Sequence, residues 1–193
     1  MDRYRIAIIV GSLRKDSINL KVARSLCALS GDRLDCDIVE IGGLPLYNQE
    51  SDAEPPEEYR KFREEIAAAD GILFVTPEYN RGMPGVLKNA IDVGSRPYGK
   101  SVWNQKPAAI VSASPGSIGG ALANHQVRQS CVFLNMPVMQ HPEAYLGRVG
   151  DDSFDADGCL QDGPLKDIIV SLSTAFADWV HLIHQSRALL AAK

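Results

Sequence analysis

The chain has 193 residues, of which 45% are hydrophobic and 23% are charged, a balance typical of one globular domain with a full core. The formal net charge of -4 gives no reason to expect a nucleic acid or an anionic membrane as a partner, so we expect a small molecule. No segment has the pattern of a signal peptide or a membrane span, which predicts a cytoplasmic protein. The four cysteines lack C-x-x-C spacing, which disfavours a metal site and a redox disulfide.

Short apolar runs alternate with longer amphipathic patterns along the chain, as is typical of βα units and a parallel sheet. The periodicity predicts strands at 5–10, 34–40, 71–76, 107–114 and 138–146, and helices at 18–29, 57–69, 84–93, 120–134 and 165–185. Residues 72–75 are apolar without alternation, which predicts a strand buried on both faces. The units predict an α/β, flavodoxin-like fold: one domain over residues 1–193, with a doubly wound five-stranded parallel sheet in the order 2-1-3-4-5 and helices on both faces.

The loop between the first strand and the first helix carries the residue types of a phosphate site. Unpaired N–H groups and the positive dipole end of a helix stabilise a phosphate dianion at this position. Four side chains of the loop can add hydrogen bonds: Ser12, Arg14, Ser17 and Asn19. Because the loop has one glycine, it fits a phosphate monoester better than a dinucleotide or a nucleoside triphosphate. Taken alone, these residues fit a capped helix and a solvated turn equally well.

Two further loops should lie at the same edge, because the carboxyl ends of parallel strands meet there. In the loop after the third strand, prolines stiffen the backbone and Tyr79 offers a ring for stacking. Glu78 and Asn80 offer hydrogen bonds to the edge of a planar heterocycle. The loop after the fourth strand, residues 112–120, is small enough to admit a flat ring close to the main chain. Each loop alone could be a turn selected for shape, but together they favour a binding site.

Several motifs resemble those of a known family. Residues 11–19 (GSLRKDSIN), 77–80 (PEYN) and 84–92 (PGVLKNAID) resemble the motifs of the NAD(P)H-dependent FMN reductase family. Residues 95–101 (SRPYGKS) and 135–139 (NMPVM) resemble its bacterial soluble chromate and quinone reductase branch. The likeness runs from residue 6 to about residue 146, and the set in this order is far more specific than the first motif alone.

The resemblance implies non-covalently bound FMN as cofactor and NAD(P)H as reductant. It places the phosphate on Ser12, Arg14, Ser17 and Asn19, and the isoalloxazine ring on Pro77, Glu78, Tyr79, Asn80, Ser114 and Gly116. It further implies that FMN carries the hydride without a catalytic side chain, that quinones and chromate are acceptors, and that the protein is a homodimer or homotetramer. The preference between NADPH and NADH and the role of residues 147–163 stay open.

Two other functions fit parts of the sequence. A flavodoxin-type one-electron carrier is the alternative, but such carriers have a longer Thr/Ser-rich phosphate loop and an acidic flavin surround, whereas this loop is short and basic. A phosphate-ester hydrolase is disfavoured because Cys27 lies too far along the first helix to serve as the nucleophile of the loop. We also expect His181 and His184 to be exposed on the last helix, and Tyr98 and Trp103 to be exposed aromatics beside a neighbouring subunit.

Overall fold

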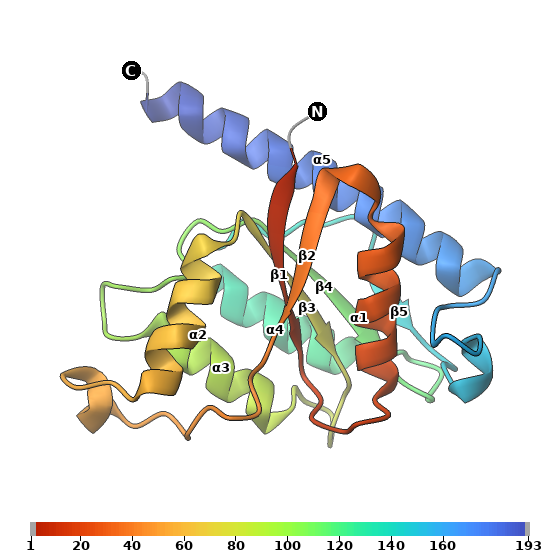
Figure 1. Ribbon diagram of the computed structural model, residues 1–193, viewed down its shortest axis with the longest axis horizontal. Helices are drawn as coiled ribbons and strands as arrows, with labels where there is room; N and C mark the ends of the chain where they lie inside the picture. The colour runs from red at the N-terminus through yellow and green to blue at the C-terminus, as the bar shows by residue number, and fades with distance from the viewer. Residues whose placement is uncertain (1–2, 192–193) are drawn as a thin grey trace.

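Figure 1 shows the computed structural model, which describes residues 3–191. A parallel sheet forms its centre, with the strand order β2-β1-β3-β4-β5. Its strands are β1 (Tyr4–Val10), β2 (Leu34–Val39), β3 (Gly71–Thr76), β4 (Ala108–Ala113) and β5 (Ala144–Leu146). The helices are α1 (Ile18–Leu29), α2 (Glu57–Ala68), α3 (Gly85–Ser95), α4 (Ala121–Phe133) and α5 (Pro164–Ala191). The predicted doubly wound, flavodoxin-like fold is therefore confirmed.

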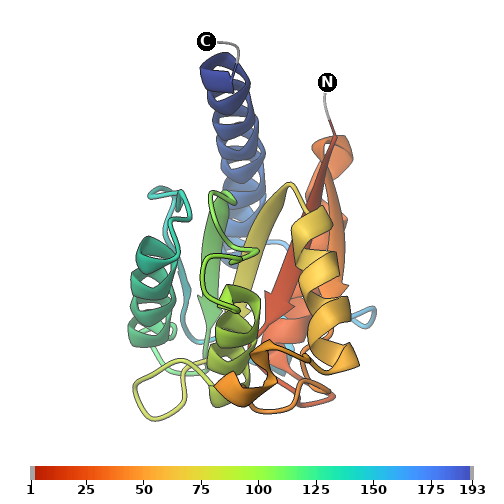
Figure 2. The same ribbon diagram turned by 90° about the vertical axis from the view of Figure 1, so that its left-hand side faces the viewer.

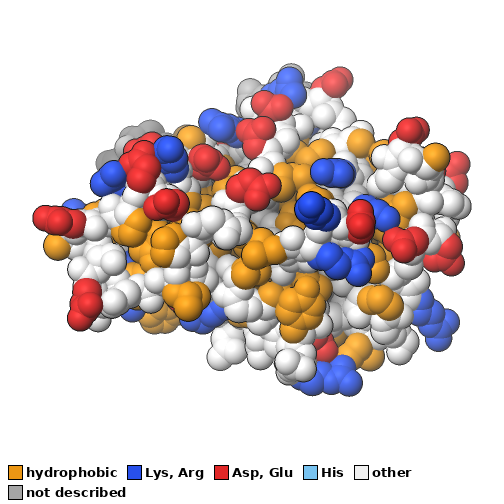
Figure 3. All heavy atoms as spheres, turned by 60° about the horizontal axis from the view of Figure 1, so that its bottom comes forward, with side chains coloured by type: hydrophobic (Ala, Val, Ile, Leu, Met, Phe, Trp, Pro, Cys, Tyr) orange, Lys and Arg blue, Asp and Glu red, His pale blue; other side chains and the backbone are white. Residues whose placement is uncertain are grey.

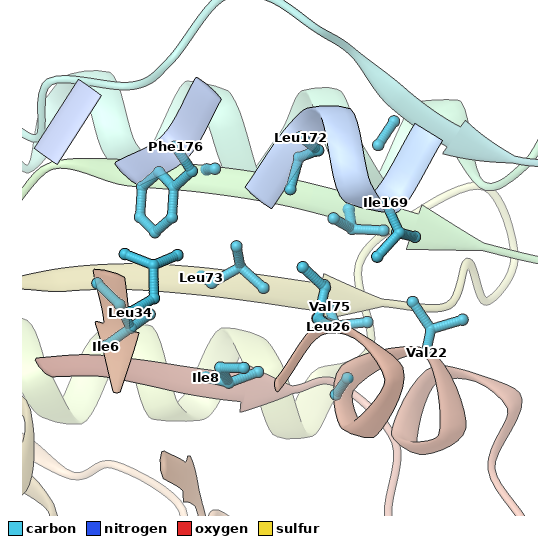
Figure 4. Close-up of a cluster of buried hydrophobic side chains, with 14 of the residues drawn as sticks. Ile6, Ile8, Val22, Leu26, Leu34, Leu73, Val75, Ile169, Leu172 and Phe176 are labelled. Atoms are coloured by element: carbon cyan, nitrogen blue, oxygen red, sulfur yellow. The ribbon is translucent and has the colours of Figure 1, made fainter. Parts of the chain in front are cut away.

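Helices cover both faces of the sheet, and each face has its own hydrophobic cluster. Figure 2 shows α2, α3 and α4 on one face, with α1 and α5 on the other. On the α1 and α5 face, Ile6 and Ile8 of β1 pack with Leu26 of α1 and Phe176 of α5 (Figure 4). Successive residues of a strand point to opposite faces, so Ala7 and Ile9 belong to the other cluster. All six residues of β3 are buried, as expected of a central strand covered on both sides.

The carboxyl ends of the strands meet at the lower edge of Figures 1 and 2. The start of β1 and the end of α5 lie at the opposite edge, where α5 extends beyond the sheet. Among residues 3–191, no helix is long and apolar enough to cross a membrane.

The fifth strand is much shorter than the predicted 138–146. Only Ala144–Leu146 pair with β4, and Val138 forms an isolated bridge with Ala108. Pro142 has no N–H group to donate to a ladder, and the chain leaves the sheet after this bridge and returns to it at Ala144. The last helix departs from prediction in the other direction, because it continues to Ala191 rather than to residue 185.

The expectation that Trp103 is exposed is wrong, whereas Tyr98 is 88% exposed as expected. Trp103 has no exposed surface, and its indole N–H donates to the Ile91 carbonyl at 2.9 Å. The ring lies against Gly94 of α3, where an added Cβ would come within 2.5 Å of three indole atoms. Trp103 is therefore a core residue that requires glycine in the neighbouring helix.

The expectation of an exposed histidine pair is also wrong, because His181 and His184 are half-buried. Nδ1 of His181 lies 2.8 Å from the Tyr4 hydroxyl, and Nε2 of His184 lies 3.0 Å from the Asp70 carbonyl oxygen. The His184 ring also stacks on Tyr4, with ring centroids 5.4 Å apart. The two histidines thus connect α5 to Tyr4, where β1 begins, and to Asp70, the residue before β3.

Candidate functional site

The three unusual loops lie together at the carboxyl edge of the sheet, where they surround a small cavity of about 180 Å³. Eight of the ten predicted site residues line it: Ser12, Arg14, Ser17, Asn19, Pro77, Glu78, Tyr79 and Ser114. Asn80 and Gly116 belong to the same loops but are not part of the lining. Figure 3, which brings this edge forward, shows Lys and Arg side chains gathered beside hydrophobic ones near the middle of the face.

Ser17 caps α1, and this local role is compatible with a ligand. Its backbone is extended, and its hydroxyl oxygen accepts from the Leu20 N–H at 3.3 Å. The capped-helix interpretation of Ser17 is thus correct. A serine hydroxyl also has a hydrogen to donate, so the cap does not prevent Ser17 from binding a phosphate oxygen.

Only one of the two polar groups of the buried Asn19 side-chain amide has a hydrogen-bond partner in the described part of the chain. Its Nδ2 donates to the Ala113 carbonyl at 3.1 Å, which sets the orientation of the amide. Its Oδ1 has no partner among the described residues, although the side chain is only 3% exposed. An unpaired buried acceptor costs about 1–3 kcal/mol, so this oxygen calls for a donor from a ligand or water. A hydroxyl group can donate, whereas a phosphate dianion can only accept.

Arg14 brings positive charge to the cavity, and Lys15 lines a second cavity that shares Ser12 and Arg14 with it. Among residues 3–191 neither forms a salt bridge, and Arg14 uses one of its five N–H donors on the Asp16 carbonyl. Nearby, the Lys21 ammonium, 2.9 Å from Asp151, holds the pKa of that carboxyl below its usual range, with a smaller contribution from Arg14. The phosphate loop therefore carries two cations, Arg14 and Lys15, that have no carboxylate partner among the described residues.

The loop after β3 makes a tight turn. Tyr79 and Gly82 exchange two backbone hydrogen bonds of 3.0 Å, and both intervening residues, Asn80 and Arg81, have positive φ angles of 52° and 65°. Positive φ at both central positions defines a type I′ turn, a geometry that asparagine tolerates better than arginine. Tyr79 stays 53% exposed, so its ring is available for stacking. The Glu78 carboxylate contacts α4 instead of facing solvent.

The loop after β4 depends on close backbone contacts. Gly119 has a φ of 61°, and a Cβ there would lie 2.5 Å from the Tyr145 carbonyl carbon. The Ser114 hydroxyl accepts from the Gly116 N–H at 3.1 Å. This loop is therefore folded tightly against the strand edge and leaves little side-chain volume over the cavity.

The structure also gives residues 147–163 a structural role that the sequence left open. Phe154 and Leu160 are buried in the cluster below α1 and α5. The Leu160 N–H donates to the buried Ser25 hydroxyl at 3.0 Å. Lys21 of α1 also contacts the segment, because its ammonium pairs with Asp151 and lies over the Phe154 ring. The segment therefore closes the core beside the phosphate loop.

A larger cavity, of about 1100 Å³, lies at the opposite edge beneath the end of α5. Lys106 and Arg187 both line this cavity. Burial lowers the pKa of Lys106, and its ammonium donates to the carbonyls of Ala67, at 2.6 Å, and Ala69. Lys106 thus stabilises the end of α2. The polar groups suited to a cofactor converge at the smaller cavity, which is therefore the candidate functional site.

Comparison with known proteins shows which family the chain belongs to. The model of the family described as NADPH-dependent FMN reductase matches residues 4–151. The chain is 57% identical to a quinone reductase of Pseudomonas putida over 180 residues, which are 93% of this chain and 96% of that one. It is 46% identical to a 2-hydroxy-1,4-benzoquinone reductase of Burkholderia sp., over 91% of this chain and 96% of the relative.

A solved structure of a similar protein has the same fold. FerB, a flavoenzyme NAD(P)H:(acceptor) oxidoreductase of Paracoccus denitrificans, superimposes with a TM-score of 0.87 at 39% identity, covering 92% of this chain and 97% of FerB. These matches favour a reductase over the one-electron carrier. The chain belongs to the NADPH-dependent FMN reductase family, and it is an oxidoreductase with FMN as its cofactor and NAD(P)H as its reductant.

Proposed function

We propose that the protein reduces quinones, with FMN held in the cavity at the carboxyl edge of the sheet. The observation that carries the proposal is the unpaired Oδ1 of Asn19, a buried acceptor at the wall of a cavity that also presents Ser12, Arg14 and Ser17. A polyol chain that ends in a phosphate supplies both the donor for this oxygen and the acceptors for the other three side chains.

Within this site, we propose that Ser12, Arg14 and Ser17 bind the phosphate and that Asn19 accepts from a ribityl hydroxyl. This assignment of Asn19 differs from the phosphate contact that the resemblance implies, because its unpaired atom is Oδ1, an acceptor that a hydroxyl can satisfy and a phosphate dianion cannot. The ring would lie on the two other loops, against Pro77, Tyr79, Asn80, Ser114, Gly116 and the backbone of Glu78, whose carboxylate is turned to α4.

The size of the cavity favours an exposed ring. At about 180 Å³ the cavity is smaller than the roughly 300–1000 Å³ of pockets that enclose a small ligand. The phosphate and ribityl chain fill such a space, which leaves the ring open to solvent. An open ring suits two flat substrates that bind in turn, first the nicotinamide and then the quinone.

Held by the residues of the three loops, FMN would supply the hydride transfer that connects NAD(P)H to the quinone. The reaction consumes one proton besides the hydride, and the exposed site admits it from water. The residues of the three loops then bind and orient the cofactor, and no side chain needs to act as an acid or base.

We make three further proposals, on the compartment, on a second electron acceptor and on the oligomeric state. We propose that residues 1–193 act as one cytoplasmic domain, and that chromate is a further acceptor, drawn by the positive charges of Arg14 and Lys15.

We also propose that the protein is a homodimer or homotetramer. Tyr98 and Phe133 are exposed side chains that line grooves between α3 and α4, which is the kind of surface that a second copy covers.

The test is an anaerobic titration of the purified protein loaded with FMN. We expect NADPH or NADH to bleach the flavin absorption, and benzoquinone to restore it in one step. Running each nicotinamide separately gives the preference between them, and chromate can replace benzoquinone in the second step. Failure to bind FMN, or a stable one-electron form after partial reoxidation, would contradict the proposal.

A further inference from the structure

We propose that Glu78 is a positioning residue: its carboxylate caps α4 and thereby holds the loop after β3 against the loop after β4. The effect on FMN rests on the proposed function, whereas the cap is a property of the protein alone. The two parts are therefore tested separately below.

The carboxylate of Glu78 is engaged by three donors. Its Oε2 accepts from the backbone N–H groups of Leu122, at 2.9 Å, and Ala123, at 3.2 Å. Its Oε1 accepts from the Arg81 guanidinium at 3.2 Å. The side chain is only 8% exposed, so these contacts replace water almost completely. A negative charge at the first turn of a helix is also favoured by the helix dipole.

Helix α4 needs this cap from outside, because it cannot provide its own. The residue before its first turn is Gly120, which has no side chain to accept a hydrogen bond. Gly120 has a φ of 72°, and a Cβ there would lie 3.2 Å from the Ser112 Cβ and 3.6 Å from the Glu78 Cβ. The serine or aspartate that usually caps a helix is thus disfavoured at this position.

The neighbouring amides show how much of the first turn depends on Glu78. The N–H groups of Ala121 and Asn124 bond to the carbonyls of Ile118 and Gly120, at 3.2 and 3.1 Å. The N–H groups of Leu122 and Ala123 lie between them and receive the Glu78 carboxylate. In an isolated helix, the first-turn amides have no partner within the helix. Glu78 therefore protects two specific amides and leaves two adjacent ones to the backbone.

The position of Glu78 in the chain links this cap to the ligand site. Pro77 and Tyr79, the residues on either side of it, both line the cavity. Anchoring the side chain between them restricts the backbone that carries the stacking ring. A loop ordered in advance does not lose that freedom when the ligand binds, so the cap should strengthen binding without touching the ligand.

The first experiment measures amide hydrogen exchange in the full-length protein without FMN. We expect Glu78→Ala to speed exchange at Leu122 and Ala123 by about tenfold or more, and to change Ala121 and Asn124 much less. Glu78→Gln keeps an oxygen acceptor and should retain most of the protection. Arg81→Ala is the matched control, because it removes the ion pair with the exposed Arg81 side chain and leaves the cap. Equal exchange at Leu122 and Ala123 in the wild type and Glu78→Ala would overturn the cap.

The second experiment measures the affinity of the same variants for FMN by quenching of flavin fluorescence. We expect Glu78→Ala to weaken binding about tenfold or more, and Glu78→Gln and Arg81→Ala to stay within about threefold of the wild type. Weaker binding with unchanged amide exchange would mean that Glu78 contacts the ligand directly, and faster exchange with unchanged affinity would mean a purely structural cap; both overturn the positioning role. A wild type that binds no FMN would contradict the proposed function while the exchange result still tests the cap.

Discussion

Arg14 is the residue on which the phosphate assignment can be tested most directly. We expect Arg14→Ala to weaken FMN binding by about 1.5–3 kcal/mol, the range for a hydrogen bond to a charged group. Riboflavin has no phosphate, so its affinity should not change, as titration of each flavin into the FMN-free protein would show. Lys15→Ala is the control for general loss of positive charge. Equal losses for FMN and riboflavin would exclude a phosphate contact.

Asn19 should behave differently, because we assign it to a ribityl hydroxyl. Leucine has nearly the shape of asparagine but no polar atoms, so Asn19→Leu removes the Oδ1 acceptor. We expect the affinities for FMN and riboflavin to fall together, by about 1–3 kcal/mol each. A loss confined to FMN would return Asn19 to the phosphate, as the family resemblance implies.

The packing of Gly94 against Trp103 can be tested by adding a single methyl group. In most helix interiors alanine is more stable than glycine by about 1 kcal/mol. Here we expect Gly94→Ala to destabilise the protein by about 1–3 kcal/mol in urea unfolding, because the new methyl overlaps the Trp103 indole. Gly85→Ala at the start of the same helix is the control, since nothing lies within 4 Å of the added Cβ. Equal stability of the two variants would show that the indole moves aside easily.

At the scale of the elements, periodicity was sufficient wherever a strand or helix packs along its whole length. The predicted order of strands follows from such patterns, as in the fully buried β3. Trp103 was misassigned because it lies in a loop without periodicity, and its burial depends on Gly94, nine residues away. His181 and His184 were misassigned because their partners, Tyr4 and Asp70, are over a hundred residues away along the chain.

In the site, too, some features could be predicted from the sequence and others could not. The loops were predictable, because their position follows from the strand order and their residue types suit a phosphate and a flat ring. The direction of individual side chains was not. Asn19 has its amide donor turned to Ala113, and Glu78 has its carboxylate turned to Leu122 and Ala123. Both contacts join elements that only the folded chain brings together.

The segment of residues 147–163 gives a prediction at this scale. Ser25 of α1 is fully buried and accepts from the Leu160 N–H. We expect Ser25→Ala to leave this N–H unpaired and to lower the free energy of unfolding by about 1–3 kcal/mol, with faster amide exchange at Leu160. Ser171→Ala, on the exposed side of α5, should have no comparable effect. No change at Leu160 would mean that the segment is held by its apolar side chains alone.

For the whole molecule, the exposed apolar surface between α3 and α4 makes the assembly testable. Phe133 is 86% exposed and lines both grooves there. We expect Phe133→Glu to shift the protein to monomers at concentrations where the wild type is a dimer or tetramer, as light scattering after gel filtration would show. Leu46→Glu, at an equally exposed site in a loop, is the control. A monomeric wild type would exclude the proposed assembly.

The placement of the chain ends bears on how the protein can be handled. Because β1 begins and α5 ends at the edge away from the three loops, a linker joined to either end would leave on the far side from the cavity. Attached to an electrode or a bead through such a linker, the protein would present the edge of the three loops outward. Diffusing nicotinamides and quinones would then reach the flavin without crossing the support.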